Sequence, residues 1–161
     1  MTRLVFLLAL LTVVPEQKPA THRAPDLLIE GWLSTAGPYG ESWWYTLTPG
    51  GSVSLHVDYI LNPSGSLMAE FHVSDEDVAR VRKAIETERF LELPEKISAE
   101  MVELHRPDYR LTITLGGRRA QVSLYDPAQI KSDPRTARFL KVWNEMYRCL
   151  PVKPSTAAAE Q

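Results

Sequence analysis

Cysteine is almost absent from this sequence of 161 residues, which contains only Cys149. A single thiol cannot close an internal disulfide, so packing must hold the fold together. Because no cysteine stands directly after the amino-terminal apolar run, lipid attachment at an amino-terminal cysteine is also excluded. Cys149 lies in the apolar stripe of an expected helix, which predicts a buried structural thiol rather than a nucleophile.

An excess of positive charge is lacking as well. The chain has 18 Lys and Arg against 20 Asp and Glu, which gives a formal net charge of −2, and it has no basic run. A protein that binds DNA or RNA needs a basic patch to neutralise phosphates. The composition therefore predicts no nucleic-acid partner.

The amino-terminal apolar run is too short to anchor the chain in a bilayer. It extends from Leu4 to Val14, whereas a membrane span needs about 20 residues. Arg3 before it and Pro15 after it complete a pattern that is typical of a secretory signal. We expect a signal peptide over residues 1–20 and a linker over 21–26, with the exact cleavage site open. The mature protein is then periplasmic or secreted, with no stable membrane span after signal removal.

Local catalytic motifs are also missing from the sequence. It contains no nucleophile elbow, phosphate loop, dinucleotide fingerprint or paired-histidine zinc motif. We therefore expect no enzymatic activity and no cofactor. An active site assembled from scattered residues is kept as a third hypothesis, because no local motif would reveal it.

What the sequence does contain is a clear alternation of apolar and polar residues. Gly116-Gly117 separates two alternating runs, over 109–115 and 118–125, which predicts a β-hairpin with a two-residue turn. Placing Leu111 opposite Val122 gives one apolar and one polar face. A slip of one residue would mix the two faces, so this register is well specified.

A second hairpin is predicted around Pro49-Gly50-Gly51, with Leu47 opposite Val53 on its apolar face. The two strands of this hairpin, a third alternating run and a further apolar run predict four strands. These runs cover residues 43–48, 52–60, 66–73 and 27–33. Gly31 weakens the prediction for the last of them, because glycine is unfavourable inside a strand.

Two helices follow from capping signals. Ser74 is an N-cap before three acidic residues, and Asp133 with Pro134 begins a second helix that runs to about Cys149. The order of strands, helix, hairpin and helix predicts a two-layer α+β domain over 27–150. Its antiparallel sheet should have four to six strands, with two helices packed on one face. Residues 151–161 are expected to form a disordered tail.

Two family resemblances cover part of this plan. Phe71 to Asp77, Phe90-Leu91-x-Leu93-Pro94 and Asp108 to Ile113 resemble the emfourins, small protein inhibitors of thermolysin-type metallopeptidases. That resemblance implies an extracytoplasmic metallopeptidase as partner. Tyr45 to Val53 resembles instead a family of small exported bacterial proteins of unknown function, although residues 37–40 lack the cysteines usual in that family. Both families share the predicted order of elements.

Polar residues on two predicted adjacent strands are weak candidates for a metal site. His56, Asp58, Glu70 and His72 fall on the polar face, and imidazole and carboxylate ligands suit zinc. A sheet with one buried face nevertheless carries polar residues on its solvent-exposed face, whether or not it binds a metal. We prefer this second interpretation and expect no metal site.

Trp44 is the first candidate for a binding surface. The hairpin register places it on the polar face beside His56, where its ring offers a flat surface for a protein or a sugar. An edge tryptophan that packs on a loop is the simpler alternative, because single exposed apolar residues are common.

The segment Glu95 to Asp108 is the second candidate, since it is the longest irregular stretch inside the predicted domain. It forms either a binding or inhibitory loop or a short structural helix over 98–102. Its candidate binding residues are Glu103, His105 and Asp108.

Taken together, these features favour an exported, non-enzymatic binding module. Its most specific form is a proteinaceous inhibitor of an extracytoplasmic metallopeptidase, acting through the segment Glu95 to Asp108 or the adjacent sheet edge. The alternative is an exported structural or accessory protein.

Overall fold

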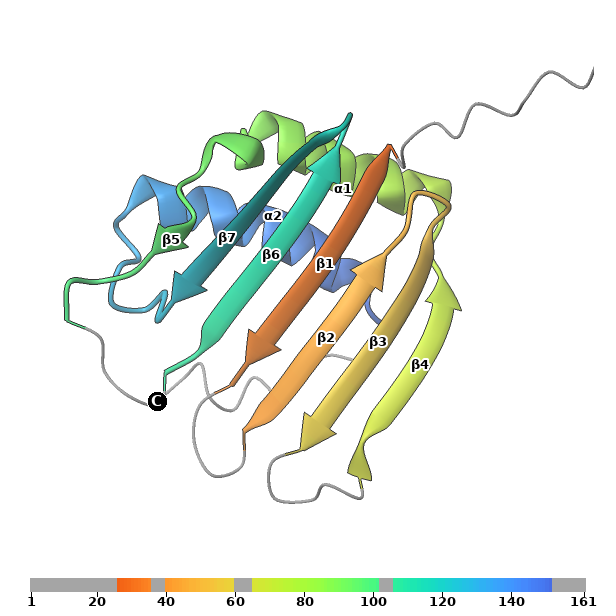
Figure 1. Cartoon of the computed structure of the whole chain (residues 1–161), viewed down its shortest axis with the longest axis horizontal. Helices are drawn as coiled ribbons and strands as arrows, with labels where there is room; N and C mark the ends of the chain where they lie inside the picture. The colour runs from red at the N-terminus through yellow and green to blue at the C-terminus, as the bar shows by residue number, and fades with distance from the viewer. Residues whose placement is uncertain (1–25, 36–39, 60–64, 102–105, 152–161) are drawn as a thin grey trace, which may run out of the picture.

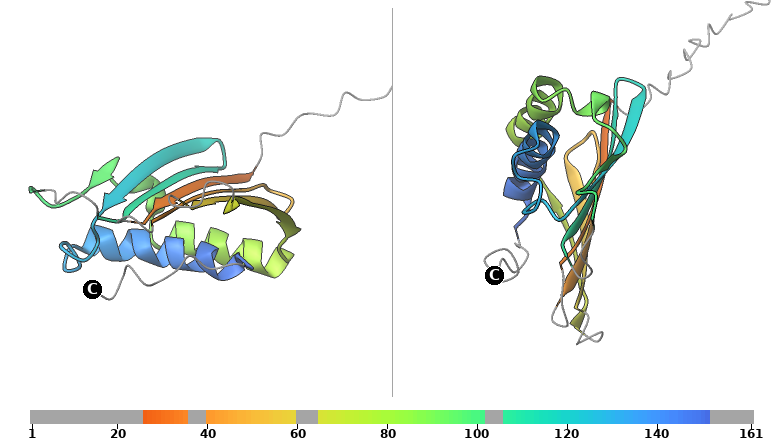
Figure 2. Two further views of the ribbon diagram at one scale, coloured as in Figure 1. Left: turned by 90° about the horizontal axis from the view of Figure 1, so that it is seen from below. Right: turned by 90° about the vertical axis from the view of Figure 1, so that its left-hand side faces the viewer.

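A seven-stranded sheet carries the fold, and two helices lie against one of its faces (Figure 1, Figure 2). The computed structural model describes residues 26–35, 40–59, 65–101 and 106–151. The order of strands across the sheet is β4-β3-β2-β1-β6-β7-β5. The strands are β1 (Leu27–Ser34), β2 (Glu41–Leu47), β3 (Ser52–Tyr59), β4 (Leu67–His72), β5 (Lys96–Ile97), β6 (Asp108–Leu115) and β7 (Arg118–Tyr125). The helices are α1 (Asp75–Thr87) and α2 (Pro134–Cys149), and the 3-10 turn η2 (Phe90–Glu92) follows α1.

Three predicted regions fall largely beyond the described part of the chain. The expected signal peptide, residues 1–20, lies outside it. So do all but the last residue of the linker 21–26 and all but the first residue of the tail 151–161.

Both predicted hairpins are confirmed, in the predicted registers. Leu47 lies opposite Val53 in the pair β2–β3, and Leu111 lies opposite Val122 in the pair β6–β7. Gly116 and Gly117 have φ angles of 57° and 79°, in the left-handed region that glycine adopts without a steric penalty. The strands predicted before and after the first hairpin are also present, as β1 and β4.

The predicted strand number, four to six, is wrong by one strand, and the sheet is mixed rather than purely antiparallel. The additional strand is β5, which pairs with β7 in parallel through Lys96 and Ile97. Ile97 is almost fully buried, and the amide of Ser123 donates to the carbonyl of Glu95 at 2.8 Å. Two residues are too few to show alternation, so the sequence pattern could not reveal this strand.

The central strand β1 depends on Gly31, the residue that weakened its prediction. Gly31 lies opposite Tyr45 of β2, and the Tyr45 ring covers it. A Cβ atom on Gly31 would lie 1.9 Å from Cζ of Tyr45. The Tyr45 hydroxyl donates a hydrogen bond to Sδ of Met146 in α2, at 3.5 Å. Glycine is therefore required here by the close approach of a neighbouring ring, which is one of the recognised reasons for glycine inside a strand.

The predicted helix starts are confirmed. The Ser74 hydroxyl accepts from the amide of Asp77 at 3.1 Å, and the Asp133 carboxylate accepts from the amide of Arg135 at 2.8 Å. Both side chains thus satisfy amide groups that an uncapped helix leaves unpaired. Pro134 occupies the first turn of α2, as expected.

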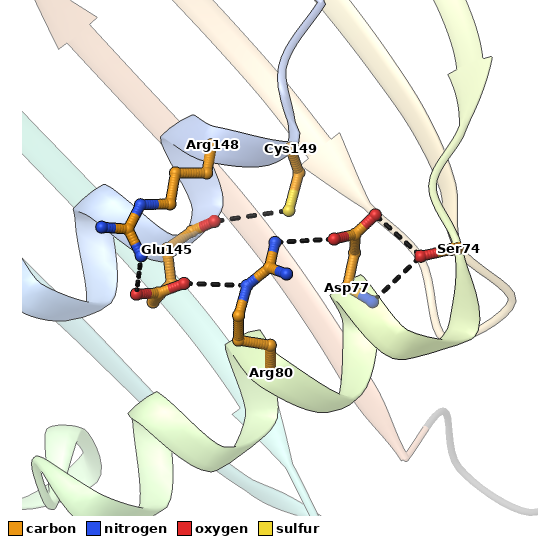
Figure 3. Close-up of polar contacts among 6 residues, drawn as sticks. All are labelled: Ser74, Asp77, Arg80, Glu145, Arg148 and Cys149. Carbon is orange, nitrogen blue, oxygen red and sulfur yellow. Dashed lines mark hydrogen bonds and ion pairs between the residues drawn. The ribbon is translucent and has the colours of Figure 1, made fainter.

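An ionic network joins the two helices on their outer side (Figure 3). Arg80 of α1 contacts Oδ1 of Asp77 at 2.6 Å and Oε2 of Glu145 in α2 at 2.9 Å. Arg148 contacts the other oxygen of Glu145 at 2.6 Å. The Cys149 thiol donates to the carbonyl of Glu145 at 3.3 Å, and burial raises its pKa. Cys149 is only half-buried, which corrects the prediction that it is buried.

The core fills the space between the sheet and the helices. Trp143 of α2 packs against two tyrosines of the sheet, with its ring centroid 5.0 Å from that of Tyr109 and 5.8 Å from that of Tyr45, both in edge-on geometry. Phe90 of η2 is fully buried and contacts Phe139 of α2, with ring centroids 5.8 Å apart. The turn after α1 therefore packs into the core through Phe90 and Leu93, both of which are buried.

Candidate functional site

The sheet face opposite α1 and α2, here called the open face, is the candidate functional site. No described helix or strand covers it in the two views of Figure 2. The alternation along each strand sends most apolar side chains towards the helices and most polar side chains to the open face. This surface is broad and lies on rigid strands rather than on loops.

Five side chains form a single row across the open face, here called the aromatic row. Direct cross-strand pairing joins each member to the next, from β4 through β3, β2 and β1 to β6. In that order the row consists of Met68, His56, Trp44, Trp32 and Arg110.

Ring contacts join two pairs of neighbours within the aromatic row. The Trp44 and His56 ring centroids are 5.3 Å apart, and the guanidinium carbon of Arg110 lies 5.2 Å from the centroid of Trp32. The Trp44 side chain is 40% exposed and that of Met68 is 79% exposed. Such large apolar side chains normally gain about 1.5–3 kcal/mol from full burial. The row therefore offers substantial apolar surface that the chain itself leaves in water.

Hydrogen bonds fix the polar side chains around the row. His56 Nε2 lies 2.9 Å from Oδ1 of Asp58, and the Ser66 hydroxyl donates to the same oxygen at 2.9 Å. Further along the strands, the Arg119 guanidinium lies 3.4 Å from Oε2 of Glu30. A hollow open to solvent lies beside Trp44 and His56, bounded by Thr46, Ser54, Met68 and Glu70.

Charge is distributed unequally over the open face. On one side, β3 and β4 present the carboxylates of Asp58 and Glu70, and neither strand contributes a Lys or Arg to this face within the described residues. The other side, formed by β6, β7 and β5, presents more cationic than acidic side chains. These are Arg110, Arg119 and Lys96 against Asp108. The open face is therefore acidic towards one edge of the sheet and basic towards the other.

The weak metal candidates share a face but do not converge. His56 lies opposite Met68, whereas Glu70 lies opposite Ser54 and His72 opposite Ser52. Glu70 and His72 are therefore displaced along the strands from the contact between His56 and Asp58. Among the described residues, no group of three or more His, Cys, Asp or Glu side chains could hold a metal ion.

The predicted loop residues are only partly visible. Glu103 and His105 lie outside the described residues, whereas Asp108 begins β6 and lies opposite Ser34 and Tyr125. Burial raises the pKa of Asp108, an effect that the nearby charges of Arg110 and Lys96 oppose. Described residues 98–101 are not helical, so the helix over 98–102 is wrong for this part of the segment.

The base of this segment adjoins the end of the aromatic row. A second solvent-open hollow contains side chains from the ends of the segment and from the neighbouring strands: Glu95, Lys96, Asp108, Arg110, Gln121, Ser123 and Tyr125. Arg110 belongs both to this hollow and to the aromatic row. The two surfaces that the sequence singled out separately are therefore continuous.

Sequence reasoning located Trp44 and His56 correctly but missed Trp32, Arg110 and Met68 as members of one surface. The register with Leu111 opposite Val122 places the neighbouring Arg110 on the polar face of the hairpin, opposite Ser123. No local signal could align that hairpin with β1, because their pairing joins residues far apart in sequence.

No protein-family model and no curated protein matches this chain. The resemblance to the emfourins therefore stays a prediction based on the segments quoted above. None of the helices in the described ranges is long and apolar enough to cross a membrane.

Proposed function

We propose that this chain is an exported, non-enzymatic binding module that recognises a protein partner through the open face of its sheet. The aromatic row is the observation that carries this proposal, because it leaves Trp44 and Met68 in water on a rigid surface. Tryptophan, methionine and arginine are enriched in protein interfaces, and tryptophan and arginine are frequent hot spots.

The shape of the face favours a macromolecule over a small substrate. Small-molecule sites are usually concave and enclose most of the ligand. Here the hollows beside Trp44 and Arg110 are both open to solvent, and they lie along a continuous sheet surface. A protein partner can cover both hollows at once, which a small molecule cannot do.

The partner class we propose is an extracytoplasmic metallopeptidase, on the basis of the resemblance to the emfourins. The root of the segment Glu95 to Asp108 lies beside Arg110, so a partner that covers the aromatic row also reaches this segment. A segment anchored at both ends loses less conformational freedom on binding than a free peptide does.

The experiment is a titration of the purified protein into a thermolysin-type peptidase, with peptide hydrolysis as the readout. We expect inhibition at micromolar concentration, and we expect Trp44→Ala to weaken it by about tenfold or more, as the loss of an interface hot spot does. The control is Arg118→Glu, because Arg118 begins β7 and faces the helix side of the sheet rather than the open face.

Replacing residues 98–106 by a short Gly-Ser linker tests the second contact. Absence of inhibition by the intact protein would remove this peptidase class as the partner. If Trp44→Ala leaves the inhibition unchanged, the open face is not the inhibitory site. Equal inhibition by the intact protein and the linker variant would exclude the segment.

A further inference from the structure

We infer that, when no other partner is bound, the open face is covered by a second copy of this chain in a two-fold symmetric dimer. The inference rests on the proposed function only in using the same face. Its basis is the charge distribution described above, acidic on β3 and β4 and basic on β6, β7 and β5. A surface with this polarity is complementary to itself after a suitable rotation.

The strand order defines that rotation. β1 is the middle strand of the sheet, with three strands on either side. A two-fold axis between two facing sheets, close to the direction of β1, places β2 over β6, β3 over β7 and β4 over β5 of the second copy. Each acidic side then meets the basic side of the other copy. Two sheets can pack face to face in this way with their strands at about 30°.

The aromatic row gives this arrangement a specific contact. Within the row, Trp44 and Arg110 lie on either side of Trp32, one strand away in each direction. The rotation therefore places Trp44 of one copy over Arg110 of the other. Arg110 already contacts the ring of Trp32 in its own chain, at 5.2 Å. In the dimer the guanidinium would lie between two tryptophan rings, a favourable cation–π environment.

The charge nearest the axis is already neutralised within each chain. Glu30 lies on β1, and a two-fold axis along this strand brings the two copies of Glu30 near each other. The Arg119 guanidinium of the same chain lies 3.4 Å from Oε2 of Glu30. This ion pair reduces the repulsion that two carboxylates would otherwise produce at the centre of the interface.

The size of the face is sufficient for a stable dimer. At a spacing of about 4.8 Å between strands and a rise of about 3.3 Å per residue, the strands β1 to β7 cover roughly 740 Å² on the open side of the sheet. Specific interfaces bury about 800 Å² per partner, with a range that begins near 600 Å². Exposed side chains of the two edge strands, Met68 on β4 and Lys96 on β5, add to this area.

The test is sedimentation equilibrium of the purified protein, expressed from the whole sequence, at concentrations up to about 200 µM. We expect a monomer–dimer equilibrium. Trp44→Ala and Arg110→Glu should each raise the dissociation constant by about tenfold or more, because each removes both symmetric contacts. Arg118→Glu makes the same charge change on the helix side of the hairpin and should alter the constant by about twofold or less. Urea unfolding of each variant checks that the fold is retained.

A mixing experiment tests the pairing itself. In a heterodimer of Trp44→Ala with Arg110→Glu, one of the two contacts is restored, because one chain keeps Trp44 and the other keeps Arg110. We expect an equimolar mixture to dimerise more tightly than either variant alone. A contact of Trp44 with Trp44, or of Arg110 with its own chain only, would give no such gain.

Three results would overturn the inference: a monomeric wild-type chain over the whole range, a dimer unaffected by both variants, or a mixture that gains nothing. These outcomes are independent of the peptidase titration. A monomeric chain that still inhibits a peptidase through Trp44 would refute the dimer and leave the proposed function standing. If the chain forms a dimer that depends on Trp44 but does not inhibit the peptidase, the dimer stands and the peptidase is refuted as a partner.

Discussion

The substitution Gly31→Ala should destabilise this fold far more than a single methyl group normally does. Alanine is ordinarily the better residue inside a strand, by about 0.5–1 kcal/mol relative to glycine. At this position the new Cβ would lie 1.9 Å from Cζ and 2.2 Å from Cε1 of Tyr45. Real carbon atoms do not approach so closely, so the Tyr45 ring must leave its site.

The magnitude follows from what that ring contacts. Tyr45 is 4% exposed, its ring meets Trp143 at 5.8 Å, and its hydroxyl contacts Met146 at 3.5 Å. Overpacking a core costs about 1–3 kcal/mol, and complete loss of a large aromatic side chain costs about 3–5 kcal/mol. We expect Gly31→Ala to lower the free energy of unfolding by about 2–4 kcal/mol, between these two limits.

Urea unfolding followed by tryptophan fluorescence measures this loss, and a double-mutant cycle assigns its cause. In a Tyr45→Ala background the ring is gone, so Gly31→Ala should be nearly neutral or slightly stabilising. Tyr45→Phe is the control, because phenylalanine keeps the colliding Cζ and Cε1 atoms and should not relieve the clash. The reasoning fails if Gly31→Ala changes stability by less than about 0.5 kcal/mol, or if the two substitutions are additive.

Two further predictions concern the helix ends. Hydrogen bonds from the Arg135 side chain and amide lower the pKa of Asp133 below its ordinary value of 3.8. The folded state is therefore stabilised above that value, and the stabilisation disappears as the pH falls through the lower folded pKa. Asp133→Asn should flatten the acid side of the stability curve, measured as urea midpoints from about pH 2 to 6, and an unchanged acid slope would contradict this. Arg138 donates to the carbonyls of Glu88 and Arg89 at 2.7 and 2.8 Å, so Arg138→Met should cost about 1–2 kcal/mol in urea unfolding. Lys141→Met removes only the ion pair to the Glu88 side chain and should cost about 0.5 kcal/mol or less, so equal losses would refute the capping role of Arg138.

The parts of the fold that the sequence predicted are those governed by local signals. Gly116 and Gly117 set the turn of their hairpin, and alternation then set its register, with Leu111 opposite Val122 as expected. Ser74 and Asp133 marked the helix starts because capping acts within one turn. In each case the information lies within a few residues of the feature.

The parts that the sequence did not predict depend on distant neighbours. Nothing near Gly31 shows that a tyrosine ring will cover it, so glycine counted against a strand that is in fact central. Ile97 forms a strand because it pairs with β7 and is buried there, not because of the residues next to it in the sequence. The candidate surface divides in the same way. Trp44 beside His56 followed from one hairpin, whereas Trp32 and Arg110 joined them only through the pairing of β1 with β2 and β6.

The position of β1 has a consequence for how this chain folds. Among the described strands, β1 comes earliest in the sequence, yet it is the middle strand of the sheet, and its residue Leu27 pairs with Leu115. The meander from β1 to β4 can form early, but the other edge of β1 has no partner until β6 is available. Such long-range pairing slows folding, and an unpaired apolar strand edge promotes aggregation in the meantime. We therefore expect the rate-limiting step to be the arrival of β6 on β1, with folding completed late rather than in the order of synthesis.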